Sequence, residues 1–163
     1  MAVSATETLD NSHLYVIQTL DDLNDVQWDI AGVVDDWSVK DTVAHLASYE
    51  HLLLEILQSF IGQSGDKTYI TSYRQGQEQF NTSQVQQRKY ETAQHVMDEY
   101  QDVQTQTSSL LAQISPDVVE KEGTVPTSDA NPSGSLARLI ENLASHTRTH
   151  CDQVRAFRQR QNQ

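Results

Sequence analysis

The segment LARLIENLASHTRTHCDQVRAF, residues 136–157, has the pattern of a long amphipathic helix. Residues spaced three or four apart along it form one stripe: Leu136, Leu139, Leu143, His146, His150, Val154 and Phe157. This spacing places them on one helix face, and an apolar face packs against the core of a helical protein. The two histidines are four residues apart, so they lie one above the other on the face that is predicted to be buried.

Two imidazoles on a buried face need partners, because burying an unpaired polar group is costly. Adjacent imidazoles repel each other when charged and need a shared partner when neutral. We interpret His146 and His150 as metal ligands that share one ion with a third residue. The alternative is a hydrogen bond from each ring to a carbonyl or a carboxylate, and this alternative is favoured for a histidine that stands alone at the edge of a core.

Three other segments show helical spacing, and glycines and prolines lie outside the four segments or at their ends. We predict helices at about residues 11–28, 38–61, 82–114 and 133–160. Ser38 and Asp41 form an S-x-x-D capping box that starts the second helix. Asn131 and Pro132 suit the cap and first position of the fourth helix.

The connections over residues 63–81 and 115–131 are longer than tight turns, so at least one of them is predicted to be a crossover. Patterns of period two, which are typical of strands, are scarce. A chain of 163 residues is long enough for one domain with a sizeable core. We therefore predict a single all-α domain over residues 1–163, a four-helix bundle with a long crossover connection.

The composition excludes several classes of protein. The net charge of −12 disfavours nucleic-acid binding, which depends on neutralising phosphates. No apolar run approaches the ~20 residues that span a bilayer. The first ten residues lack the basic region and apolar core of a signal peptide, and the single cysteine, Cys151, fits a reducing compartment. We expect a cytoplasmic protein that contacts neither membrane nor nucleic acid.

The third ligand is predicted on the second helix, which contains His45 and His51. His45 lies beside the apolar row, about two turns after the capped start. His51 lies six residues later, about 600 degrees further around the helix at ~100 degrees per residue, so both cannot bind one ion. We choose His45. His13 and His95 are predicted to be solvated.

Three imidazoles without a carboxylate suit zinc, nickel, iron or copper rather than magnesium or calcium. Tyr49, one turn after His45, is the candidate catalytic residue, because its phenol can orient a substrate or donate a proton; the alternative is a packing role. Asp41 or Glu141 is a candidate partner for the far nitrogen of a ligand histidine. Arg148 is predicted to lie on the surface, and Cys151 to be a small buried residue.

Two motifs resemble one known family. The segment DWSVKDTVAHL, residues 36–46, resembles the entry to the second helix of the DinB superfamily, with a tryptophan, a capping serine and a later histidine. The segment SHTRTH, residues 145–150, is similar to the H-x-x-x-H of that family's last helix. Phe80 and Asn81 resemble the branch that includes the proteins of colibactin self-protection.

This resemblance implies a bundle with up-down-down-up topology and an open triad of His45, His146 and His150. It also implies a divalent transition metal, such as zinc, nickel or iron, and a homodimer. Several members resemble thiol S-transferases in which the metal activates a low-molecular-weight thiol.

Two classes of function remain open from the sequence. The first is a metal-dependent thiol S-transferase or hydrolase, in which a metal-activated thiol or water attacks a small-molecule electrophile during detoxification. The second is a non-catalytic metal- or ligand-binding helical-bundle dimer. A third option is a metal-free hydrolase of the colibactin-protection type, which would act without the three histidines.

Overall fold

The computed structural model describes residues 3–63, 65–126 and 133–162, and these residues form eight helices and no β-strand. The predicted all-α class is therefore confirmed. The helices are α1 (Ala5–Leu20), α2 (Asp25–Trp28), α3 (Val39–Phe60), α4 (Thr68–Gln75), α5 (Gln77–Gln87), α6 (Ala93–Ala112), α7 (Pro116–Glu120) and α8 (Leu136–Gln161). No helix of the described chain is long and apolar enough to cross a membrane.

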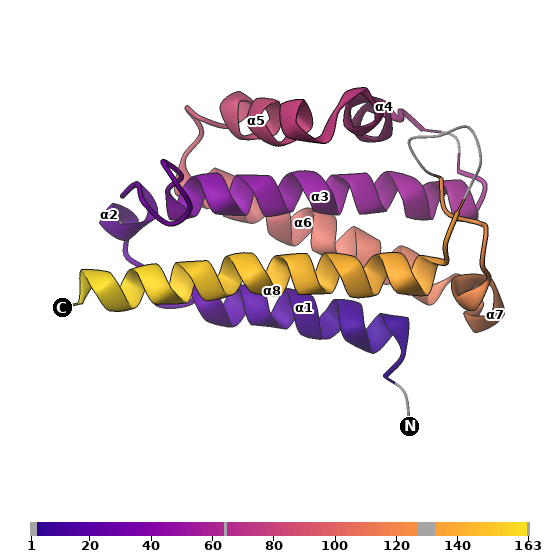
Figure 1. Ribbon diagram of the computed structural model, residues 1–163. Coiled ribbons are helices and arrows are strands. Elements are labelled where there is room, and N and C mark those ends of the chain that lie inside the picture. The colour runs from indigo at the N-terminus through magenta and orange to yellow at the C-terminus, as the bar shows by residue number, and fades with distance from the viewer. Residues whose placement is uncertain (1–2, 64, 127–132, 163) are drawn as a thin grey trace.

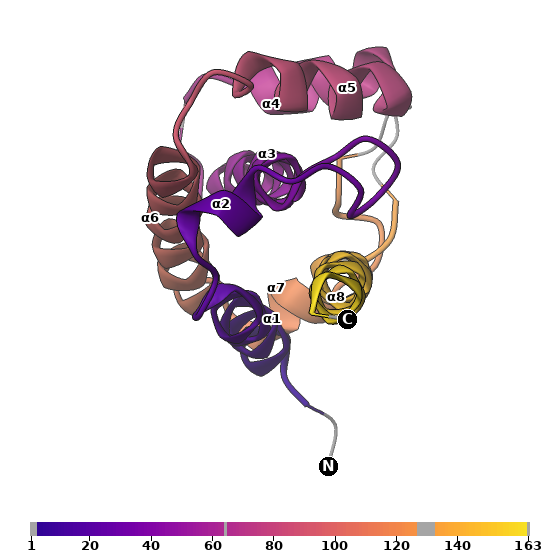
Figure 2. The same cartoon turned by 90° about the vertical axis from the view of Figure 1, so that its left-hand side faces the viewer.

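Four long helices, α1, α3, α6 and α8, form the bundle (Figure 1). The α1 and α8 helices run in one direction along the bundle, and α3 and α6 run in the other, which is the predicted up-down-down-up order. The end-on view places the four around a common axis (Figure 2). Helix α3 packs most closely on α6, and α1 on α8. The connection between α3 and α6 returns along the length of the bundle, and α4 and α5 lie within it, outside α3.

The first predicted helix was wrong at its start and in its interior. Helix α1 begins at Ala5 rather than near residue 11, because the Ser4 side chain accepts a hydrogen bond from the Glu7 backbone N–H. It ends at Leu20, and Asn24 then starts α2 with a capping box of its own. A capping side chain starts a new helix at a point where the apolar periodicity alone would predict that the first helix continues.

The third predicted helix, 82–114, is two helices. Thr92 caps α6 by accepting from the His95 backbone N–H, so α5 and α6 are separate. The preceding stretch, 63–81, was predicted as a connection, but it contains α4 and the first turns of α5. Gly76 separates those two helices with a φ of 153°, a value that favours glycine.

The other two predicted helices lie close to their expected bounds. Ser38 and Asp41 form the predicted capping box at the start of α3. Helix α8 is capped by Ser135, whose hydroxyl accepts from the Arg138 N–H. The predicted cap at Asn131–Pro132 lies outside the described residues.

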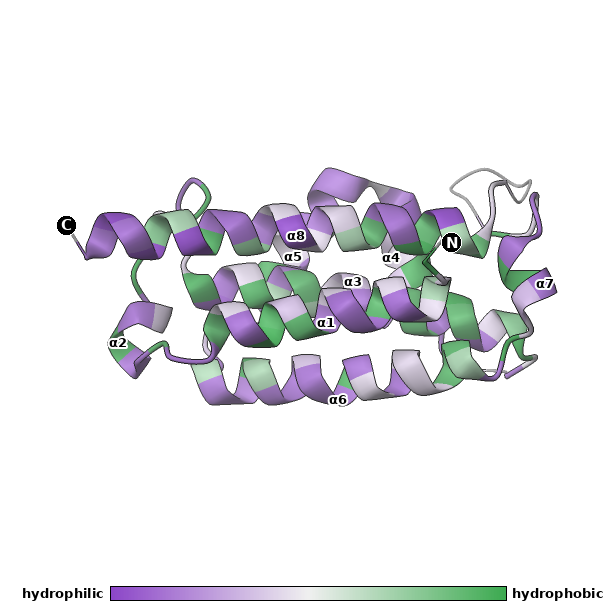
Figure 3. Ribbon diagram, turned by 90° about the horizontal axis from the view of Figure 1, so that it is seen from below, coloured by the Kyte–Doolittle hydropathy of each residue, from purple (hydrophilic) through white to green (hydrophobic). Residues whose placement is uncertain are grey.

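Hydrophobic and hydrophilic residues alternate along α1, α6 and α8 (Figure 3), whereas α3 is buried on all sides over most of its length. The buried row of α8 differs from the predicted stripe. Ile140 and Cys151 are buried, whereas Leu139, Leu143, His146 and His150 are only partly buried. Cys151 packs in one core cluster with residues of α1, the helix on which α8 lies most closely. The middle of the predicted row therefore borders the core, whereas Leu136, Val154 and Phe157 at its ends are buried as predicted.

Candidate metal centre

Helices α3 and α8 run antiparallel and bring His45, His146 and His150 together. The Nε2 atom of His146 lies 3.1 Å from that of His45 and 3.1 Å from that of His150. The capping box at Ser38 fixes where α3 begins, and therefore the direction in which His45 points. One turn of α8 separates His146 from His150. The ring nitrogens of all three predicted histidines lie within 4.8 Å of one another.

The two short contacts at His146 cannot both be hydrogen bonds. An imidazole nitrogen has one in-plane position, which holds either a proton or a lone pair. If His146 Nε2 donates to one neighbour, it has no lone pair with which to accept from the other. A positive ion between the three Nε2 lone pairs satisfies all of them at once.

The spacing also fits a metal site. Metal–nitrogen bonds of about 2.0–2.1 Å place cis or tetrahedral ligand nitrogens about 2.9–3.4 Å apart. The two 3.1 Å separations between Nε2 atoms fall in that range. Three protein ligands also leave coordination positions for water or a substrate, as in catalytic zinc sites. The donor set therefore fits a divalent transition metal.

The surroundings of the three rings keep them neutral, which is the form that binds a metal. Burial, followed by the neighbouring His150 and His146, lowers the pKa of His45 to about 3. Burial and His150 lower the pKa of His146 to about 4. Burial lowers the pKa of His150 as well, although its hydrogen bond to Gln153 opposes the shift. At neutral pH all three nitrogens offer lone pairs.

The far nitrogens of the trio do not use the predicted carboxylates. Asp41 accepts from the Ser38 backbone N–H, and Glu141 lies on the exposed side of α8. Instead, His150 Nδ1 donates to Gln153 Oε1 at 2.8 Å, while the buried Nδ1 atoms of His45 and His146 have no hydrogen-bond partner among the residues that the structure describes. The prediction for Asp41 and Glu141 was wrong, because Asp41 is engaged in the capping box that the sequence itself indicated and Glu141 is exposed on α8.

Aromatic rings enclose the trio on two sides. The Trp37 ring centroid lies 5.0 Å from that of His45 and 6.5 Å from that of His150. A tight turn holds Trp37, since its carbonyl accepts from the Gly32 and Val33 N–H groups. Apolar walls exclude water from a metal site and lower the local dielectric. The sequence motif contained Trp37, but its contacts with His45 on α3 and His150 on α8 could be seen only in the folded structure.

Tyr49 forms the second aromatic wall. Its ring centroid lies 4.9 Å from that of His45 and 4.8 Å from that of His146. Its hydroxyl donates to Asn81 Oδ1 on α5 at 2.7 Å, so the crossover helix fixes the phenol. Burial raises the pKa of Tyr49, which therefore stays protonated at neutral pH. The structure thus places the candidate catalytic residue beside the trio, with its hydroxyl directed at α5.

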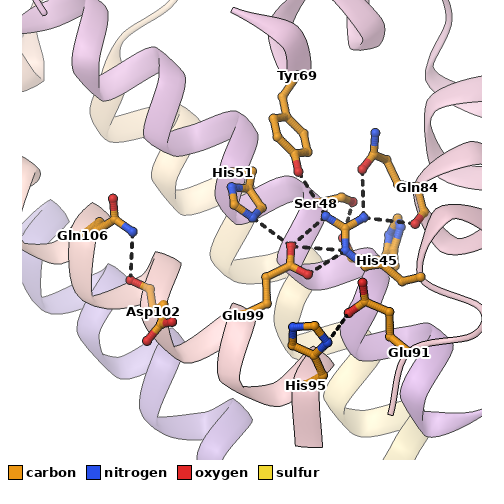
Figure 4. Close-up of polar contacts among 11 residues, drawn as sticks. His45, Ser48, His51, Tyr69, Gln84, Glu91, His95, Glu99, Asp102 and Gln106 are labelled. Carbon is orange, nitrogen blue, oxygen red and sulfur yellow. Dashed lines mark hydrogen bonds and ion pairs between the residues drawn. The ribbon is translucent and has the colours of Figure 1, made fainter. Parts of the chain in front are cut away.

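The three remaining histidines lie elsewhere. His51 Nε2 donates to Glu99 at 2.8 Å, in a network that Arg88, Gln84 and Tyr69 complete (Figure 4). Exposed His95 pairs with Glu91, as the same view shows. His13 was predicted to be solvated, and this was wrong. It is 6% exposed, and its Nε2 donates to buried Glu50 at 2.5 Å.

Two further side chains lie where the sequence predicted. Arg148 is exposed on α8, and its guanidinium lies 4.3 Å from the Tyr15 ring centroid. Cys151 is 2% exposed, and burial raises the pKa of its thiol to about 11. A thiol in this state is a poor nucleophile and a poor metal ligand. Neither residue belongs to the trio.

The topology and the trio define a class: an up-down-down-up helical bundle whose second and fourth long helices share a three-histidine cluster. The sequence matches the DinB superfamily over residues 9–154. The chain therefore belongs to that superfamily, as its motifs indicated.

Two solved structures are similar to this chain. One is an uncharacterised protein from Escherichia coli UTI89, with a TM-score of 0.79 and 15% identity over 99% of this chain and 96% of that one. The other is DfsB, described as a sibling lethal factor precursor, with a TM-score of 0.75 and 14% identity over 100% of this chain and 99% of that one. These identities are low, so the likeness shows a common fold. No curated protein sequence matches this chain.

Proposed function

We propose that this protein is a metal-dependent enzyme in which His45, His146 and His150 hold a divalent transition metal such as zinc, nickel or iron. One observation carries the proposal: three neutral imidazoles converge through Nε2 atoms whose short contacts cannot all be hydrogen bonds. Membership of the DinB superfamily supports it.

The reaction that we propose is attack by water or a low-molecular-weight thiol on an electrophilic carbon. A bound divalent metal lowers the pKa of a water or thiol ligand toward neutrality. In the attack, a new C–O or C–S bond forms, the bond to the leaving group breaks, and the leaving group takes up a proton. A homodimer and a cytoplasmic location remain predictions.

The side chains around the trio have separate tasks in this proposal. Trp37 and Tyr49 exclude water from two sides of the three rings. Asn81 fixes the Tyr49 hydroxyl, and the phenol stays protonated because of its burial. With this geometry Tyr49 orients a substrate that enters between α3 and α8, while its hydroxyl proton is engaged by Asn81.

The test is elemental analysis of the untagged protein beside a variant in which His45, His146 and His150 are all alanine. We expect about one transition-metal ion per chain in the wild type and none in the variant. Circular dichroism checks that the variant is still folded. A folded wild type that takes up neither zinc nor nickel would refute the proposal and favour a metal-free hydrolase or a binding protein.

A further inference from the structure

An apolar cavity of about 110 Å³ lies beside the histidine trio, between α3, α4 and α8. Aliphatic side chains form most of its wall, with contributions from Ile56 on α3, Ile70 on α4 and Leu139 on α8. The charged residue in the wall, Arg74, is exposed to solvent. Protein cores contain few voids larger than one water molecule, so a cavity of this size needs an explanation.

The residues of the cavity and of the trio follow one another along the facing sides of two helices, a region that we call the α3–α8 slot. On α8, Leu139, Leu143, His146 and His150 follow each other at steps of three or four, so they share one face. On α3, Ile56, Leu52, Tyr49 and His45 do the same in the opposite direction. The aliphatic half of each row lines the cavity, and the histidine half forms the trio.

Tyr49 lies at the junction of the two halves. Its ring lines the cavity and also contacts the His45 and His146 rings. Leu143 lines the cavity one turn before His146, which corresponds to about 4.5 Å along the helix axis. A molecule bound in the cavity therefore contacts Tyr49, the ring that lies against the trio.

Size and polarity define what the cavity accepts. An engineered cavity of about 150 Å³ lined by Leu, Ile and Phe stays dry and binds benzene or xenon. A lining of the same chemistry around about 110 Å³ suits a compact hydrocarbon group and penalises a charged one, which would lose its hydration.

We propose that this cavity binds the apolar part of the substrate, a hydrocarbon group of about the size of benzene, and directs an attached electrophilic carbon toward the trio. The inference rests on the proposed function for the reaction itself. The binding of the hydrocarbon group is a property of the cavity alone and can be measured without turnover.

The experiment is a benzene titration of the full chain, as purified and after chelation, followed by NMR. We expect saturable shifts of the Leu139 and Leu143 methyl signals and of the His146 ring signal, whereas the exposed His95 ring stays unchanged. Leu139→Trp places a larger side chain in the cavity and should weaken binding about tenfold or more. Leu14→Trp, on the exposed side of α1, is the matched control and should bind as the wild type does.

If Leu139→Trp does not fold, Ile56→Phe fills the same cavity from α3. Saturable binding that Leu139→Trp or Ile56→Phe abolishes supports the inference. Absence of saturable binding to the folded wild type, or equal binding by a folded cavity-filling variant, overturns it. Because elemental analysis tests the metal separately, metal without benzene binding refutes the cavity alone, and benzene binding without metal refutes the proposed reaction alone.

Discussion

Buried histidines in this protein are stabilised in two different ways. At the interface of α1, α3 and α6, His13 donates to Glu50, which also accepts from the Thr107 hydroxyl. In the α3–α8 slot, the described neighbours within hydrogen-bonding distance of His146 Nε2 are two other imidazoles. A carboxylate completes the first arrangement, so it needs no ligand. The second brings together three ring nitrogens within 4.8 Å of one another and has no carboxylate among them, which leaves it suited to bind a cation.

The pair of His51 and Glu99 belongs with the first arrangement. Arg88, whose side chain is 7% exposed, donates to the same carboxylate from the end of α5. Tyr69 on α4 accepts from the Arg88 guanidinium. This network fixes the crossover helices that supply Asn81 to Tyr49 and Ile70 to the cavity. The His51–Glu99 network thus stabilises the helices around the slot, and the histidine trio lies inside the slot.

The largest effect should follow from removing a member of the trio. We expect His150→Ala to weaken zinc binding by more than about a hundredfold, since changes in residues that only support a ligand already cost 10–100-fold. His51→Ala is the matched control, because it removes a histidine that pairs with Glu99, and it should leave zinc binding unchanged. Isothermal titration with zinc measures both. Equal losses of zinc affinity in the two variants would contradict the distinction between the metal-binding trio and the histidines that pair with a carboxylate.

Removing Glu50, the carboxylate that binds His13, should instead lower stability and leave zinc binding unchanged. Glu50→Ala removes the buried acceptor of both His13 and Thr107 and should lower the free energy of unfolding by about 3 kcal/mol. Zinc content should stay at the wild-type value, because Glu50 does not contact the trio. Urea unfolding of the metal-free protein measures the loss. A change below about 0.5 kcal/mol would show that this pair contributes little.

A smaller effect, dependent on pH, is expected at Glu99. Burial raises the pKa of this carboxyl, but hydrogen bonds and charges from His51 and Arg88 outweigh it and hold the pKa at about 2, against 4.5 ordinarily. A pKa lowered by folding stabilises the protein above pH 4.5, and this contribution is lost as the pH falls toward 2. Glu99→Gln should cost about 2 kcal/mol at pH 7, and the difference from wild type should shrink between pH 4.5 and 2 in urea unfolding. A difference constant with pH would contradict the assignment.

The sequence predicted the trio because short-range rules orient each histidine and the family resemblance implied the topology that brings them together. The step of four between His146 and His150 and the capping box before His45 set the direction of each side chain on its own helix. The antiparallel order of α3 and α8 then follows from the topology. The same local rules predicted the burial of Cys151 and the exposure of His95.

The missed features depend on contacts between distant residues or on caps. His13 was predicted to be solvated because its acceptor, Glu50, lies 37 residues away on another helix. The middle of the row predicted as the centre of the α8 core is its edge, because α8 packs most closely on α1 rather than on α3, whereas the two ends of the row are buried as predicted. The helix bounds changed where Ser4, Asn24 and Thr92 act as caps. No periodicity along one helix contains this information.

The smallest expected effect concerns Gln153, which accepts from His150 Nδ1 with a neutral amide where His13 and His51 use carboxylates. Gln153→Ala should weaken zinc binding about tenfold, the low end of the range for such partners. Gln153→Glu gives the trio the carboxylate that it lacks, and should restore or tighten binding because a carboxylate makes the ligand nitrogen more basic. Gln159→Glu, exposed on the same helix, adds the same charge further from the trio and is the control. Equal tightening in both Glu variants would mean that long-range charge, rather than the hydrogen bond to His150, sets the affinity.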